Sequence, residues 1–340
     1  MSDRGPGPGP LPAVSVVMAS RGRRSMLRPF VEALVGDPAL TEVVIVLDGD
    51  VDGSPDALEE LGREFPVVRP VLADQRGQSG ALELGVERSR SDVVLLMDDD
   101  VIAGPGLVSG HARHHAEGDG LVVLGYMPVS LYGGASPATR LYAAEYEAHC
   151  ARLESGEVPV LEGLWMGNVS ARRDDLLRVG IESERYPVRW HADTDLGLRL
   201  QAAGLHGVFD RRLRASHLQD RSAAAFLRDA RERGHGARLL EREHPDGFDV
   251  TRTVPMLDDL STPARQVVSV LGRGARAERG ARILMAVGGA LERLGWAGGS
   301  TGAAKAARRI EIVAGYRETG VEARRQAGPR PVTSGTDAGG

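Results

Sequence analysis

The 340-residue sequence has little cysteine, little lysine and no long apolar run. Its one cysteine, Cys150, excludes a disulfide framework and any zinc or iron–sulfur site built from several cysteines. Its one lysine, Lys305, stands between two alanines, which excludes a Walker A phosphate loop because that motif needs Gly-Lys-Ser/Thr. Schiff-base chemistry is disfavoured because Lys305 lies in a basic C-terminal segment.

Membrane and targeting signals are also missing from the pattern. The longest apolar runs span about six or seven residues, against the roughly 20 that a membrane-spanning helix needs. Residues 1–12 contain no apolar core of a signal peptide, and we interpret them as a disordered leader. The formal net charge of -5 does not favour nucleic-acid binding. The sequence therefore predicts a cytoplasmic protein without a nucleic-acid partner.

Short apolar runs rich in β-branched residues alternate with helix-compatible segments. The runs are largely unbroken, which is typical of strands buried on both faces, and they cover 14–18, 43–47, 67–72, 93–97 and 121–126. The helical segments between them cover 25–35, 54–64, 80–89 and 106–117. This alternation predicts an α/β fold with a doubly wound, mostly parallel sheet. Ligands of such sheets bind beyond the carboxyl ends of the strands.

The composition changes near the C-terminus. Residues 263–330 carry 13 Lys/Arg and five Glu, a net charge of +8, so the rest of the chain carries -13. Helices are predicted at 266–274, 281–294 and 303–314, and residues 331–340 are expected to be a disordered tail. Two interpretations stay open. The basic helices could rest peripherally on anionic lipid at the inner face of the membrane. They could instead pack on the acidic remainder or on a second copy, which we favour.

Three aspartates, Asp98, Asp99 and Asp100, directly follow the apolar run 93–97. Adjacent anions repel one another and raise one another's pKa unless a cation neutralises them. Oxygen ligands suit Mg²⁺ or Mn²⁺, and an imidazole from His217 would tilt the site toward Mn²⁺. The alternative is a solvated turn, in which aspartate is common.

Two more acids, Asp193 and Asp195, open a helix-like run that extends to residue 203. Asp193 could take a proton from an attacking hydroxyl near a metal-bound sugar phosphate. Asp195 fits the role of a helix cap better. A further cluster, His111, His114 and His115, has spacing that puts its members on one helix face, and we expect a solvated or subunit-facing surface rather than a zinc site.

With these motifs assembled, the chain resembles family 2 of the glycosyltransferases, which has the GT-A fold. The likeness covers roughly residues 13–236 and depends on motifs that follow one another in the expected order. They are VSVVMASRGR, VVIVLDGD, LLMDDDV, GNVSARRDDLLRVG, HADTDLGLRLQAAG and RASHLQD. The chain departs from the family pattern at Ser20, where a threonine is usual, at Glu83, where asparagine is frequent, and at Ala192, where glutamate is usual.

The resemblance implies an inverting hexosyltransferase that moves a sugar from a nucleotide-diphosphate donor to an acceptor hydroxyl on a glycan, lipid or small molecule. A UDP-sugar is the default donor because it is the commonest in the family. The implied organisation is a catalytic domain at 13–245, with a nucleotide-sugar half at 13–126 and an acceptor half at 127–245, followed by the basic helical extension at 246–330.

The resemblance also implies a role for each matching residue. Asp98, Asp100 and His217 would hold Mn²⁺ or Mg²⁺, and Asp193 would be the catalytic base. The implied donor contacts are Asp48 to the nucleotide base, Ser20 with Arg21 or Arg76 to ribose or phosphate, and Asp98 with Asp99 to the nucleotide sugar. The implied acceptor side consists of Trp165, Gly167 and Asn168.

Two other functions remain open at this stage. A sugar-phosphate nucleotidyltransferase has a similar sheet, but it needs a glycine-rich, basic signature that Arg21-Gly22-Arg23 only partly supplies. Ala192 favours a non-catalytic nucleotide-sugar-binding protein. The joint presence of Asp98, Asp100, Asp193 and His217 disfavours it.

Overall fold

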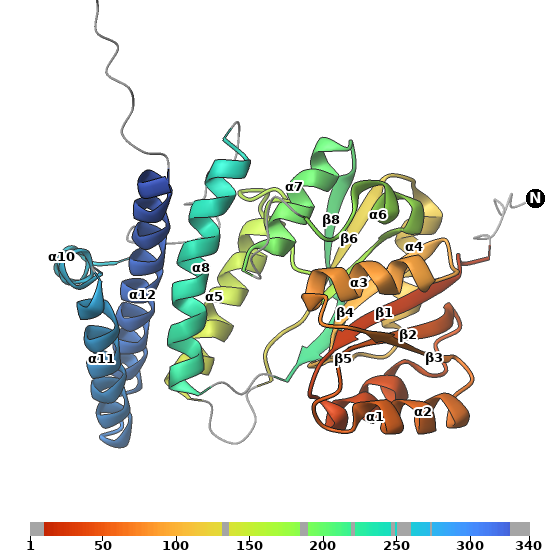
Figure 1. Cartoon of the computed structure of the whole chain (residues 1–340), viewed down its shortest axis with the longest axis horizontal. Helices are drawn as coiled ribbons and strands as arrows, with labels where there is room; N and C mark the ends of the chain where they lie inside the picture. The colour runs from red at the N-terminus through yellow and green to blue at the C-terminus, as the bar shows by residue number, and fades with distance from the viewer. Residues whose placement is uncertain are drawn as a thin grey trace, which may run out of the picture.

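The computed structural model describes residues 10–130, 136–183, 190–218, 222–245, 249, 260–272 and 274–326. Most of the predicted leader and all of the predicted tail lie outside the described residues. Figure 1 shows a sheet flanked by helices and, beside it, a group of long helices that contains the C-terminal segment. In the described part of the chain, no helix is both long and apolar enough to cross a membrane.

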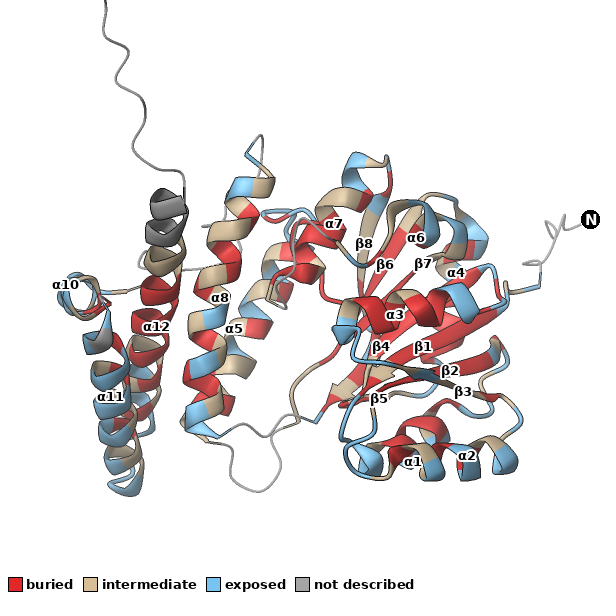
Figure 2. Ribbon diagram, viewed as in Figure 1, coloured by how far each residue is buried: buried red, intermediate tan, exposed pale blue. Residues whose placement is uncertain are grey.

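The sheet has eight strands in the order β3-β2-β1-β4-β7-β6-β8-β5. Their bounds are β1 Val14–Ser20, β2 Leu40–Asp48, β3 Val68–Ala73, β4 Val93–Asp98, β5 Val101–Ala103, β6 Leu121–Tyr126, β7 Asn168–Arg172 and β8 His206–His217. The strands β3, β2, β1 and β4 run parallel, whereas β7 is antiparallel to both β4 and β6. The apolar strands β1, β2 and β4 are buried almost throughout, as Figure 2 shows.

Helices cover the sheet on both sides (Figure 1). The helices of this part are α1 Arg24–Leu34, α2 Ser54–Glu64, α3 Gly77–Arg88, α4 Leu107–Glu117, α6 Arg173–Val179 and α7 Ala192–Ala202. In the parallel half, α1 and α2 lie on the face opposite α3. Parallel strands joined by helical crossovers need this cover, because both faces of the sheet are apolar.

The long helices form a second hydrophobic core. They are α5 Pro137–Glu154, α8 Ala223–Glu243, α10 Thr262–Leu271, α11 Ala275–Arg293 and α12 Ala297–Gln326. Residues of all five helices contribute to this core, so elements from both sides of residue 245 share it. The backbones of α8 and α12 touch, since a Cβ on Gly234 would lie 2.0 Å from the Ile312 carbonyl oxygen and one on Gly315 equally close to that of Arg231. Glycine is required at such a contact.

The α/β fold class, the mostly parallel sheet of the first half and the helical C-terminal region are confirmed. The helix predicted at 54–64 and the strand predicted at 121–126 have the observed bounds. The strand β8 is long and extends to His217, because its second half pairs with β5. The helices α5 and α8 were not predicted from the sequence. Both contribute buried residues to the core around the sheet, such as Cys150 and Leu240, as well as to the second core.

Candidate active site

The carboxyl ends of β1, β2 and β4 meet at one cleft with a volume of about 520 Å³. Side chains from both halves of the sheet and from the helical group surround it. Those predicted from the sequence are Ser20, Arg21, Asp48, Asp98, Asp99, Asp100, Trp165, Asp193 and His217. Those not predicted include Arg23, Gln78, Tyr142 and Trp190. The parallel register of β1 with β2 and β4 explains the convergence, because all three strands end at the same level.

Two of the three consecutive aspartates contact the first loop. The Ser20 hydroxyl donates to Asp99 at 2.8 Å. The Arg23 guanidinium lies 3.2 Å from a carboxylate oxygen of Asp99 and equally close to one of Asp100. Sequence reasoning considered Arg21 for this loop and missed Arg23. A sequence signal was present, since Arg21 and Arg23 both follow β1 directly.

The remaining aspartate, Asp98, is the last residue of β4. The Gln78 amide on α3 donates to its Oδ1 at 2.9 Å. Burial raises the pKa of Asp98 to about 6, and Asp100 contributes by repulsion. A Cβ on Gly167 would stand 2.6 Å from Asp98 Oδ2, so a larger residue at this position would press on the carboxylate. Gly167 therefore leaves room for the Asp98 side chain, and it does not itself line the cleft.

His217 reaches the same aspartates from β8. It pairs in register with Val101, the residue after Asp100, and its Nε2 lies 3.3 Å from Asp100 Oδ1. In the described part of the chain, no group of three or more His, Cys, Asp or Glu side chains is already arranged to hold a metal ion. The side chains present nevertheless suit a hard divalent cation as ligands, because buried carboxylates and an imidazole lie together here. The raised pKa of Asp98 means that its anionic form is disfavoured in the absence of a neighbouring cation.

Asp193 faces the cleft from the first turn of α7. The helix begins after His191, whose φ of 64° is unusual for a residue with a side chain. Asp193 Oδ1 accepts from the Thr194 backbone N–H at 2.9 Å. Burial raises the pKa of Asp193 to about 6, although the Thr194 bond and Arg233 oppose the rise. A carboxylate with such a pKa is suited to proton transfer near neutral pH.

Asp195, two residues further on, is not the helix cap that we expected. Its Oδ2 accepts from Arg199 Nε and its Oδ1 contacts His244 Nε2, each at 2.8 Å. Arg199 also donates to the carbonyl oxygens of Val179 and Ile181. Asp195 is buried at the centre of this network, which ties α7 to the end of α8 and to the turn after α6.

Asp48 lies at the end of β2 with both oxygens engaged. They accept from the backbone N–H groups of Arg76 at 2.7 Å and Gly77 at 2.9 Å. In this arrangement Asp48 positions the start of α3, while its side chain still forms part of the cleft wall. The side chain of Arg76 is exposed and does not line the cleft.

Asn168 does not face the cleft, contrary to its predicted acceptor-side position. It is fully buried on β7, where its amide donates to the Leu213 carbonyl oxygen at 3.0 Å and its Oδ1 contacts His111 Nε2 at 3.0 Å. The histidine cluster was expected to form a solvated or subunit-facing surface, and burial makes this expectation wrong for two of its members. His111 and His115 are buried and both contact Ser170, and burial lowers their pKa values to about 3 and 4.

Beside Asp193 the cleft continues into a second cavity of about 180 Å³. Its walls come from α5, α7, α8, α12 and the segment around Trp165. The side chains of Trp165 and His191 are more than nine-tenths buried here, and Trp165 Nε1 and His191 Nε2 have no hydrogen-bond partner in the described part of the chain. Buried donors without partners carry a cost that a polar ligand would remove.

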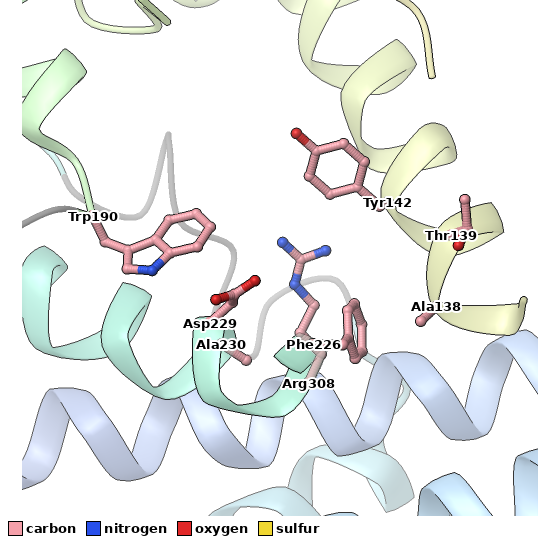
Figure 3. A pocket seen from close by; sticks show the side chains of 8 residues that line it. All are labelled: Ala138, Thr139, Tyr142, Trp190, Phe226, Asp229, Ala230 and Arg308. Atoms are coloured by element: carbon pink, nitrogen blue, oxygen red, sulfur yellow. The ribbon is translucent and has the colours of Figure 1, made fainter. Parts of the chain in front are cut away.

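Arg308 of α12 lines this cavity and a smaller adjoining pocket. In Figure 3 its guanidinium lies between Tyr142 and Trp190 and next to Phe226, whose ring centre is 5.4 Å away. Arg308 pairs with Glu145 on α5, which also accepts from Arg309 at 2.7 Å. The C-terminal helices therefore contribute directly to the wall next to Asp193.

Comparison with known proteins supports the sequence-based resemblance. Residues 15–163 match the model of "Glycosyl transferase family 2". Two Bacillus subtilis proteins are similar. The chain is 27% identical over 118 residues to the uncharacterized glycosyltransferase YfnE and 26% identical over 116 residues to the putative glycosyltransferase EpsH. These regions cover 35% and 34% of this chain but only 29% and 34% of the two relatives.

Among solved structures, the mannosyltransferase PcManGT from Pyrobaculum calidifontis, in complex with GDP-Man and Mn²⁺, has a similar fold. The TM-score is 0.61 at 15% sequence identity, and the match covers 95% of this chain and 91% of the other. This likeness establishes a shared GT-A fold that extends through the C-terminal helices.

Proposed function

We propose, from the family 2 glycosyltransferase domain to which residues 15–163 belong, that this protein transfers a sugar from a nucleotide-diphosphate donor to an acceptor hydroxyl with inversion. One observation carries the proposal. Asp98, Asp100, Asp193 and His217 come from β4, the turn after it, α7 and β8, and all four line one cleft at the carboxyl edge of the sheet. This transfer needs a binding site for a charged diphosphate next to a general base.

The donor would occupy the part of the cleft formed by the ends of β1, β2 and β4. Asp98, Asp100 and His217 would hold Mn²⁺ or Mg²⁺, which supplies Lewis-acid neutralisation of the diphosphate charge when bound. Arg21 and Arg23 would add positive charge near the leaving nucleotide, and Ser20 would reach ribose or phosphate. Asp48 would bind the nucleotide base through its cleft-facing side while it holds the start of α3.

The chemical step would be a direct displacement. The acceptor oxygen forms a bond to the anomeric carbon as the bond from that carbon to the diphosphate oxygen breaks, and the electron pair leaves with the diphosphate. The acceptor proton passes to the carboxylate of Asp193. The attack comes from the face opposite the leaving group, so the configuration inverts and no covalent enzyme intermediate forms.

The acceptor would enter through the 180 Å³ cavity beside Asp193. Aromatic rings of Trp165, Tyr146 and Trp190 line it together with charged side chains. Its unpartnered Trp165 Nε1–H supplies a hydrogen-bond donor for a hydroxyl or ring oxygen. With a volume of about 180 Å³, the cavity has room for an acceptor group next to Asp193.

A panel of donors tests the function. We expect release of nucleoside diphosphate from a UDP-sugar or from GDP-mannose when Mn²⁺ or Mg²⁺ is present, and loss of release when a chelator removes the metal. Thin-layer or mass-spectrometric detection of the glycosylated acceptor completes the assay. Consumption of pyrophosphate with a sugar phosphate would instead establish a nucleotidyltransferase. Donor binding without release, across acceptors, would indicate a nucleotide-sugar-binding protein.

The pH profile follows from the raised pKa of Asp193. The base works as a carboxylate, so the rate should be constant well above pH 6 and fall about tenfold per unit below it. The measurement is the transfer rate at saturating metal and donor between pH 4.5 and 8. A rate that stays level down to an ordinary aspartate pKa of about 4 would argue against a buried Asp193 base.

A further inference from the structure

The hairpin of α11 and α12 packs through small residues. Ala277 and Ala281 of α11 and Ala304 and Ala307 of α12 are buried in its interior. A Cβ on Gly288 would lie 3.2 Å from the Ser300 carbonyl oxygen, so the two helices approach closely along this line. Leu284 and Met285 of α11 and Ile310 and Val313 of α12 also pack in this core, so only some of the bulky apolar side chains of the hairpin are used for its packing.

Other bulky apolar side chains of the hairpin are exposed. Ile283 is 58% exposed, Val287 43%, Leu294 80% and Trp296 63%. They follow one another along α11 and its turn into α12, and Figure 2 shows this helix mostly exposed at the side away from the sheet. Two further exposed valines on α10, Val267 and Val270, belong to the same helical group. Six of the eleven large apolar side chains exposed in the described chain thus lie on α10, on α11 or in the turn after α11.

Arginines accompany this apolar surface. Arg279, Arg282 and Arg293 are exposed on α11 at the same helical spacing as Ile283, Val287 and Leu294. Of the acidic side chains of α11, Glu292 pairs with Arg140 of α5 at 2.6 Å, and Glu278 pairs with Arg282 and offsets its charge. The net positive charge of this surface therefore comes from Arg279 and Arg293. We call the surface formed by Arg279, Arg282, Ile283, Val287, Arg293, Leu294 and Trp296 the outer hairpin face.

We propose that the outer hairpin face docks on an anionic phospholipid surface, with Leu294 and Trp296 entering the headgroup region. Outward leucine and tryptophan after the end of α11, with Arg293 beside them and Arg279 and Arg282 further along the same helix, match the two requirements of interfacial binding. Burial of apolar side chains stabilises insertion into the membrane interface. The arginine guanidinium attracts the anionic headgroups while the aliphatic part of its side chain lies along the apolar boundary. This inference goes beyond the proposed transfer and holds whatever the donor and acceptor are.

The charge pattern favours lipid over a second copy of the chain. A twofold dimer through the outer hairpin face would bring the same surface against itself. Arginines from one α11 would then face arginines from the other, and like charges at an interface are costly. An anionic lipid surface has the complementary sign.

Sedimentation with vesicles tests the proposal on the full chain. Vesicles that contain phosphatidylglycerol should bind the protein, vesicles of phosphatidylcholine alone should bind it far less, and added salt should weaken binding. The variant Arg279→Gln/Arg282→Gln/Arg293→Gln should bind phosphatidylglycerol vesicles on the order of 100-fold more weakly, at about fivefold per arginine. Leu294→Ala/Trp296→Ala should also lower binding, and should remove the tryptophan fluorescence shift on binding.

The control is Arg63→Gln/Arg88→Gln/Arg90→Gln, which changes the net charge equally on exposed arginines of the other half. It should bind as tightly as the unmodified protein. Melting curves and gel filtration of every variant show whether it is folded and whether it self-associates. Failure to bind phosphatidylglycerol vesicles, equal losses from the two arginine triples, or a dimer abolished by Leu294→Ala/Trp296→Ala would overturn the proposal. None of these readouts depends on sugar transfer.

Discussion

Asp193→Asn is expected to slow transfer by on the order of 10²–10⁴-fold, the usual contribution of a positioned general base. The amide cannot accept the acceptor's proton, yet it matches the size of the carboxylate and keeps an oxygen for the Thr194 N–H. Metal-dependent donor binding should remain intact, because Asp193 is not one of the residues assigned to the metal. The measurements are the transfer rate at saturating substrates and, separately, donor binding by calorimetry.

The matched control is Asp174→Asn, the same chemical change on a side chain of α6 that is 98% exposed. It should leave both the rate and donor binding unchanged. Near-normal transfer by Asp193→Asn would remove the base from the proposed mechanism. Loss of donor binding together with the rate would instead assign Asp193 to the donor site.

Asp195→Ala should be the most destabilising single change at the site. It removes the partner of Arg199 and His244 and leaves a guanidinium inside the protein without its carboxylate. Breaking a buried ion pair in this way costs about 3–5 kcal/mol of unfolding free energy. Chemical denaturation of the purified variant, followed by circular dichroism, measures the loss.

Asp119→Ala provides the comparison, because it breaks a pair with Arg172 in which Asp119 is 93% exposed. Exposed pairs contribute little, so its denaturation midpoint should hardly move. Equal midpoints for the two variants would show that the Asp195 network does not hold α7 in place. Asp195→Asn should fall between the two, since an amide keeps one acceptor oxygen.

The donor side of the cleft follows closely from the sequence. Asp48 and Asp98 directly end apolar runs, and parallel strands present their carboxyl ends at one edge, so proximity could be inferred without coordinates. For Asp193 and His217, only the family resemblance predicted a position at that edge of the sheet. The structure lines them along the same cleft.

The acceptor side could not be read in the same way. Asn168 follows Gly167 in the chain, but alternate residues of a strand point to opposite faces, and Asn168 points into the interior toward His111. A histidine group on a helix gives no sequence signal for burial when its partners, Asn168 and Ser170, lie on a distant antiparallel strand. Tyr142 and Arg308 reach the site from α5 and α12, whose packing depends on long-range helix contacts.

The touching backbones of α8 and α12 have a consequence for how this protein can be dissected. Through that contact α12 is held where Arg308 completes the chamber next to Asp193. A truncated protein that stops at the end of the sheet would keep the nucleotide edge and lose one side of the chamber. Such a fragment should still bind a donor but select its acceptor less well, because α12 contributes part of the wall of the cavity next to Asp193.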